Sequence, residues 1–308
     1  MLTGEQKRTK FRTWLSPPNP SVNHNTACDI QHKGTATWFI QGSKFKEWKK
    51  NGSLLWIRGN RMFLPACQYF TTVNVRLISQ RARARVFFGT QLHSTCGNRE
   101  LRVLSSSAII EDIRHMQDSR SALIAYYYCD FKDVTKRDVR GLLASLLLQL
   151  VGHSDSCWDT LHQLYKASCD GLEQPSEVAL VKCLGNMIDI PGQVPIYLIV
   201  DALDECPNDT GTPSAREKVL NFVRDLLQSD HPNLFVCITS RPEQDISATL
   251  NSLTSPSNSV SLHEEGGQRQ DINSYVRSFV QTDAAMRRWR EEDKELVVNV
   301  LSERAGGM

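Results

Sequence analysis

The chain has 308 residues, of which 40% are hydrophobic and 23% charged, and its formal net charge is +2 at pH 7. This length suits one large domain with extensions or two modest domains, and the composition is typical of a globular protein. So small a net charge excludes strong electrostatic attraction to nucleic acids or membranes, and no apolar run approaches the ~18–20 residues that a membrane span needs.

Cysteine usage indicates a reducing environment. The chain has nine cysteines, an odd number, and they are scattered and form no Cys-x-x-Cys pair. Several of them, such as Cys237, lie in apolar runs. The first twenty residues also lack the apolar segment of a secretory signal. We therefore expect buried free thiols and a cytoplasmic location.

The first third of the chain changes character twice. Residues 1–37 are polar and include a turn-rich stretch at 16–20, so we interpret them as a leader or linker with little core. Aromatic spacing predicts a short amphipathic helix over 38–48. A buried strand is expected over 53–58, and Gly59 and Asn60 follow it.

Regular patterning resumes at residue 105 and predicts alternating helices and strands. Helices are expected over 105–116, 139–151, 158–167, 178–188, 215–227, 271–280 and 293–305. Strands are expected over 122–128, 195–200, 233–239 and 260–262. Buried apolar strands that alternate with helices indicate an α/β fold with a parallel sheet covered on both faces. Ligands in such folds bind beyond the carboxyl ends of the strands, here just after Ile57, Val200 and Thr239.

Acidic residues follow one of these strands directly. The apolar run 196–200 leads into Asp201, and Asp204 and Glu205 lie within the next turn. A nucleotide-hydrolysing enzyme needs one carboxylate near Mg²⁺ and a second acid that positions the attacking water. The alternative is an ordinary strand end that meets a solvated acidic turn.

The next strand ends in a second polar group. Thr239, Ser240 and Arg241 lie at its tip, where hydroxyl and guanidinium groups can sense a γ-phosphate. The alternative is a strand that meets a polar loop, with Arg241 paired to a surface acid.

Taken together, these segments resemble the NACHT domains of fungal STAND-class P-loop NTPases, in the nephrocystin-like N-terminal group. The matching segments occur in the family's order at 33–39, 53–60, 125–131, 141–150, 197–206, 238–243, 271–276 and 303–308. The resemblance implies a three-layer P-loop NTPase core over 38–265, with a leader at 1–37 and the start of a C-terminal helical region at 266–308. Because the segment 303–308 usually leads into that region, the chain looks like part of a longer protein.

The resemblance also implies roles for individual residues. Asp201 would be the Walker B magnesium residue, and Asp204 and Glu205 the catalytic acids. The nucleotide would be contacted by Gly59, Asn60, Thr239, Ser240 and Arg241. ATP or GTP with Mg²⁺ is the implied cofactor. Proteins of this kind are switches that oligomerise or bind protein partners, with no expected binding to membranes or nucleic acids.

One feature departs from the family. A P-loop has the pattern Gly-x-x-x-x-Gly-Lys-Ser/Thr, whose backbone N–H groups and lysine hold phosphates and whose hydroxyl binds Mg²⁺. No Gly-Lys-Ser/Thr occurs anywhere in this chain. Counting back from the resumed helix, the Lys and Ser positions hold Leu101 and Arg102, which lack the charge and the hydroxyl respectively. We therefore expect impaired nucleotide binding.

Residues 61–104 replace the missing loop. They contain seven arginines, no lysine and one acid, so this stretch carries +6 and the remainder of the chain −4. We interpret it as a retained intron or gene-model error, or else as an insertion tolerated in a degenerate pseudo-NTPase. The arginines at 81–85 also suggest nucleic-acid binding, but few aromatic residues accompany them. A catalytically dead interaction module therefore stays open beside the signalling switch.

Overall fold

The computed structural model describes residues 4–30, 36–59, 99–209, 211, 213–229, 231–262, 273–274, 277–278, 280–281, 286 and 289–305. At its centre lies a five-stranded sheet in the order β2-β3-β4-β1-β5, in which neighbouring strands are parallel. The strands are β1 (Ser53–Arg58), β2 (Leu123–Tyr128), β3 (Ile196–Asp201), β4 (Leu234–Ser240) and β5 (Ser259–Ser261). The predicted parallel α/β sheet is therefore confirmed, and Asn60 and residues 61–98 lie outside the described residues.

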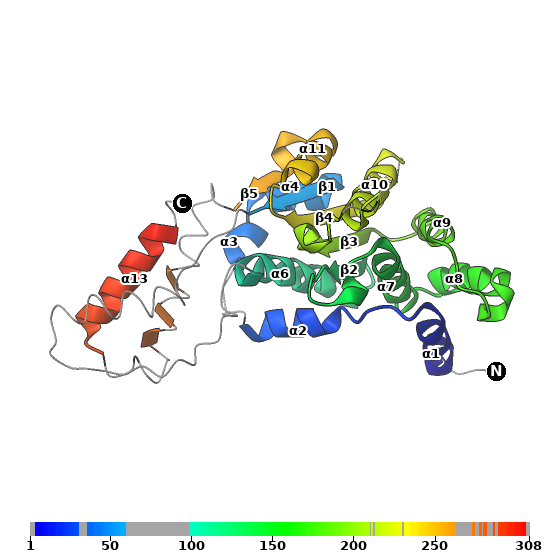
Figure 1. Ribbon diagram of the computed structural model, residues 1–308, viewed down its shortest axis with the longest axis horizontal. Coiled ribbons are helices and arrows are strands. Elements are labelled where there is room, and N and C mark those ends of the chain that lie inside the picture. The colour runs from blue at the N-terminus through cyan, green and yellow to red at the C-terminus, as the bar shows by residue number, and fades with distance from the viewer. Residues whose placement is uncertain are drawn as a thin grey trace.

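Helices cover both faces of this sheet (Figure 1). Alternate side chains along a strand point to opposite faces, so Leu54 and Trp56 join one hydrophobic core while Leu55 and Ile57 join the other. The first face packs against α1 (Gly4–Leu15), α7 (Val139–Val151), α8 (Asp155–Ala167), α9 (Glu177–Ile188), α10 (Ala215–Gln228) and α11 (Gln244–Leu253). The second packs against α3 (Thr37–Ile40), α4 (Ser43–Asn51) and α6 (Arg99–Asp118). The fold thus has three layers.

Side-chain caps fix where four helices begin. Asp138, Ser154, Ser176 and Ser214 precede α7, α8, α9 and α10, and each accepts a hydrogen bond from the backbone N–H three residues later. Such a cap satisfies a backbone donor that the helix itself leaves unpaired. The cap at Ser154 explains why α8 begins at Asp155, three residues before the start that hydrophobic spacing predicted.

The N-terminal segment corrects one expectation. We expected a leader with little core over 1–37, but α1 is followed by α2 (Ser21–Ile30), and Phe11 and Trp14 are only 1% and 5% exposed. The indole N–H of Trp14 donates to the carbonyl of Glu173 at 2.8 Å, and its ring packs edge-on against Tyr165. The prediction was wrong because the apolar residues of α1 form one helical face that docks on α8.

Three smaller differences concern helices. The single helix expected over 38–48 is divided at Gln41 and Gly42 into α3 and α4. The helix α11 was not predicted. The helix expected over 271–280 lies largely outside the described residues, whereas the last predicted helix is present as α13 (Glu291–Ala305), beyond the β5 edge of the sheet (Figure 1).

Cysteines in the described part of the chain form no disulfides. Five of them are buried, namely Cys129, Cys157, Cys183, Cys206 and Cys237, while Cys169 is exposed.

Among the helices of the described ranges, none combines the length and the apolar character that crossing a membrane demands.

Candidate functional site

At the carboxyl ends of β1, β3 and β4, predicted site residues that the structure describes lie at one edge of the sheet. Ile57 lies opposite Thr239 in the ladder, and Val200 lies opposite Ile238, so the three strands end at the same level. The N–H of Gly59 donates to the carbonyl of Ser240 at 3.1 Å, which extends the pairing of β1 with β4 beyond the strand. Gly59, Thr239 and Asp201 therefore share one edge, as the sequence predicted.

Asp201 lies at the tip of β3 and is 1% exposed. Its Oδ1 accepts hydrogen bonds from the hydroxyl of Thr239 at 2.5 Å and from the hydroxyl of Ser106 on α6. The Thr239 contact joins two strand tips, and the Ser106 contact joins the sheet to the helix that follows β1. Asp201 is thus the point at which all three elements meet.

Ser106 was missed by sequence reasoning, although a signal was present. It lies four residues after Arg102, which occupies the position expected for the P-loop hydroxyl. Residues four apart lie on the same face of a helix, one turn from each other. The spacing alone therefore places the hydroxyl of Ser106 one helical turn beyond the position expected for the magnesium-binding hydroxyl.

The chain turns sharply after Asp201. Ala202 has a φ of 54°, in the left-handed region that non-glycine residues seldom adopt, and its N–H donates to Thr239 Oγ1 at 3.0 Å. The short turn η3 (Leu203–Glu205) begins there. Thr239 accordingly binds both the carboxylate of Asp201 and the backbone that redirects the chain.

Asp204 and Arg241 form a pair at the same edge. The side chain of Asp204 is 1% exposed; its Oδ1 accepts from the backbone N–H of Arg241 at 3.0 Å, and its Oδ2 lies 3.0 Å from Arg241 Nε. The pairing of Arg241 with an acid was one of the two interpretations of the sequence, but this acid is buried rather than at the surface. The guanidinium of Arg241 is thereby oriented towards Asp204.

The third acid points elsewhere. Glu205 Oε2 lies 3.4 Å from the backbone N–H of Phe131, which follows β2, and so Glu205 contacts the opposite side of the turn from the Asp204–Arg241 pair. The structure brings Asp201 together with Thr239, and Asp204 together with Arg241. Glu205 instead contacts the segment that follows β2.

The electrostatic effect of Asp201 extends to its neighbours. Tyr128 lies opposite it in the ladder, and burial together with the charge of Asp201 raises the pKa of this phenol. The same two causes raise the pKa of Cys237. The hydrogen bond that Cys129 shares with Cys206, with the sulfur atoms 3.3 Å apart, and burial raise the pKa of Cys129 well above its usual value. Cys129 and Cys237 are therefore protonated at neutral pH and are not nucleophiles.

Part of this geometry lies in a segment that is similar to a known sequence family. Residues 102–241 match the family model described as Nephrocystin 3, N-terminal. The match supports a relation of this segment to the nephrocystin-like, NACHT-associated group. It spans β2, β3 and β4 with Asp201, Asp204, Glu205 and the polar tip of β4, and it begins where regular patterning resumes. No curated protein matches the chain.

The predicted nucleotide site has a carboxylate part and a phosphate-binding part, and only the first fits its expected ligand. In the nephrocystin-like segment, a buried carboxylate flanked by hydroxyls at a strand tip suits a hydrated Mg²⁺ ion, which is bound through oxygen atoms. The phosphate-binding half does not fit, because the chain has no Gly-Lys-Ser/Thr to follow β1. The carboxylate half therefore stands without the residues that hold phosphates.

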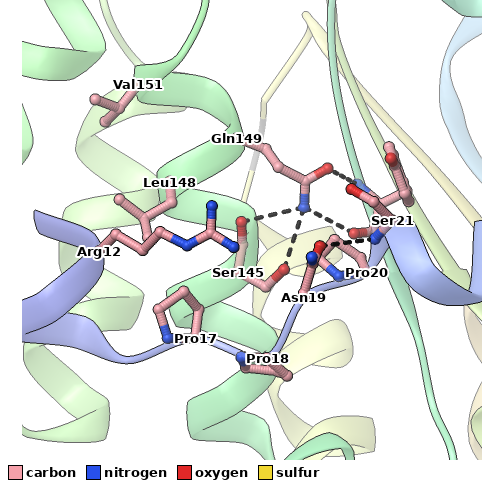
Figure 2. A pocket seen from close by; sticks show the side chains of 11 residues that line it. Arg12, Pro17, Pro18, Asn19, Pro20, Ser21, Ser145, Leu148, Gln149 and Val151 are labelled. Carbon is pink, nitrogen blue, oxygen red and sulfur yellow. Dashed lines mark hydrogen bonds between the residues drawn. The ribbon is translucent and has the colours of Figure 1, made fainter. Parts of the chain in front are cut away.

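A separate cavity of about 230 Å³ lies beside β2, and none of the predicted site residues lines it. The turn that joins α1 to α2 and one side of α7 form its walls (Figure 2). Gln149 donates to the carbonyl of Tyr126 at 2.8 Å and accepts from its N–H at 3.1 Å. Since β2 is an edge strand, this side chain occupies backbone groups that would otherwise pair with another strand.

Proposed function

We propose that the chain is a NACHT-type nucleotide-binding signalling switch module whose binding of ATP or GTP is impaired. The observation that carries this proposal is Asp201, a buried carboxylate at the tip of β3 that Thr239 and Ser106 hold at the same edge as Gly59. The impairment follows from the absent Gly-Lys-Ser/Thr. The switching role, with protein partners or self-association in the cytoplasm, rests on the family resemblance.

Equilibrium binding of ATP, ADP and GTP in the presence of Mg²⁺ tests this proposal. We expect dissociation constants of about 1 mM or weaker, because without the P-loop the triphosphate loses most of its charged contacts. Asp201→Ala should abolish whatever binding remains, whereas Asp209→Ala, an exposed acid after the same turn, should leave it unchanged. Micromolar affinity that disappears in Asp201→Ala would refute the impairment, and binding equal in both variants would refute the role of Asp201.

The second candidate is a catalytically dead NACHT-fold interaction module. Asp201 accepts from two hydroxyls and Asp204 is paired with Arg241, so both acids already have roles in holding the sheet edge together. On this reading, Asp201→Asn lowers stability but changes neither nucleotide binding nor self-association. Self-association that responds to Mg²⁺ and nucleotide, and that Asp201→Asn abolishes, favours the switch.

Sequencing the transcript distinguishes a retained intron at residues 61–104 from an insertion that belongs to the protein. If this segment is a retained intron, sequencing the message is expected to reveal a spliced form that encodes Gly-Lys-Ser or Gly-Lys-Thr shortly after Gly59. A protein made from that form should bind Mg²⁺-ATP normally. A message that encodes only the present sequence rejects the intron and leaves an insertion in a pseudo-NTPase.

A further inference from the structure

A cluster of potential metal ligands lies between α2 and α6, apart from the Asp201 edge. His24 and Cys28 are four residues apart on α2 and so share one helical face, and Glu111 approaches them from α6. His24 Nε2 lies 2.9 Å from Glu111 Oε1 and 3.5 Å from Cys28 Sγ. The ligand atoms of all three residues lie within 4.8 Å of one another.

We propose that His24, Cys28 and Glu111 form a divalent-cation site of the zinc type that clamps α2 to α6. With Zn–N, Zn–S and Zn–O bonds of ~2.0–2.3 Å at tetrahedral angles, nitrogen and sulfur lie about 3.5 Å apart and nitrogen and oxygen about 3.3 Å apart. The observed spacings of 3.5 and 2.9 Å need only a small adjustment of Glu111. A water molecule completes four coordination, and on binding, the thiol of Cys28 releases its proton to solvent.

The surroundings of His24 prepare it as a ligand. Its side chain is 1% exposed, and its Nδ1 lies 3.0 Å from the hydroxyl of Tyr128, the kind of outer contact that orients a metal-bound imidazole. Glu111, whose side chain is 44% exposed, leaves a path for the ion from solvent.

Arg114 competes for the same place. Its Nη1 lies 2.9 Å from His24 Nε2 and 2.6 Å from Glu111 Oε1. These contacts conflict, since His24 Nε2 cannot accept a hydrogen bond from Arg114 and donate one to Glu111 at the same time. A divalent cation removes the conflict by accepting lone pairs from both ligands. The side chain of Arg114 is 36% exposed, and it also bonds the hydroxyl of Tyr126 at 2.8 Å and lies over the Tyr126 ring, 5.3 Å from its centroid. It can therefore leave His24 and Glu111 while it stays on Tyr126.

Titration of the chelator-treated full chain with Co²⁺ tests the site. We expect one equivalent to bind with a thiolate-to-cobalt charge-transfer band and the visible spectrum of a tetrahedral site, and Zn²⁺ to displace it. Cys28→Ser should remove the charge-transfer band and weaken binding at least tenfold. Arg114→Gln should strengthen binding about tenfold, the factor that corresponds to the loss of one competing charged contact.

Two control variants separate Co²⁺ binding at this site from Co²⁺ binding at other residues of the chain. Cys169→Ser alters an exposed cysteine and should bind Co²⁺ as the unaltered chain does. Asp201→Ala should also keep the band, which makes the outcome independent of the proposed nucleotide site. Circular dichroism confirms that each variant is folded. A folded chain that gives no charge-transfer band, or a band that persists in Cys28→Ser, overturns the proposal.

Discussion

Replacing Phe11 with alanine is expected to lower the free energy of unfolding by about 3–5 kcal/mol, the range for truncating a buried aromatic side chain. Phe11 is 1% exposed, and its ring centroid lies 5.8 Å from that of Trp158 and 5.7 Å from that of Tyr165. Truncation leaves a cavity between α1 and α8 that these rigid rings fill poorly. Urea denaturation followed by tryptophan fluorescence measures the change.

The matched control lies on the next helix. Val22 is 59% exposed on α2, so Val22→Ala should change the free energy of unfolding by no more than about 0.5 kcal/mol. If Phe11→Ala is as stable as the unaltered chain, α1 is a dispensable leader, as the sequence alone suggested. If it unfolds early while Val22→Ala does not, α1 is part of the core.

The strands were predictable because the sheet is buried on both faces. Every residue of β3 and β4 is buried, so each strand appears in the sequence as an apolar run that ends in polar residues at its tip. The polar residues directly after such runs then had to lie at one edge, which located Asp201 and Thr239. These conclusions needed only local patterns and the geometry of parallel sheets.

The helices that escaped prediction carry weak local signals. In α1, Phe11, Trp14 and Leu15 have helical spacing, but two prolines follow closely and the remaining residues are polar. In α11, only Ile246, Thr249 and Leu250 are buried, and no side chain caps its start. Both helices owe their stability to the surfaces on which they dock, which a local pattern cannot reveal.

The missed parts of the candidate site depend on tertiary structure. The order of strands across the sheet, with β4 between β3 and β1, determines that Thr239 reaches Asp201. An arginine in the first turn of an amphipathic helix resembles a solvated residue, yet Arg216 is 6% exposed. Its partners come from the turn after β3 and from the start of α11, and no sequence spacing connects them.

Replacing Arg216 with methionine is expected to lower the free energy of unfolding by about 2–4 kcal/mol. The guanidinium donates to the buried carbonyls of Asp204 at 2.6 Å and Cys206 at 3.0 Å, and it forms ion pairs with Glu243 and Asp245. Methionine keeps the apolar stem but leaves both carbonyls without this donor, at a cost of about 1–3 kcal/mol each. The two carboxylates are partly exposed and contribute less, because water solvates them.

Arg224→Met provides the comparison on the same helix, since Arg224 is less buried and donates to the side chains of Asn221 and Thr249 rather than to buried carbonyls. It should cost no more than about 1 kcal/mol. Hydrogen exchange supplies a second readout. The backbone N–H groups of Glu205 and Cys206 donate to the carbonyls of Ala202 and Leu203. In Arg216→Met, the exchange of these two amides should accelerate more than the exchange of the amides of β3. Equal losses of stability in the two variants, with unchanged exchange in this turn, would show that Arg216 does not hold the acidic turn in place.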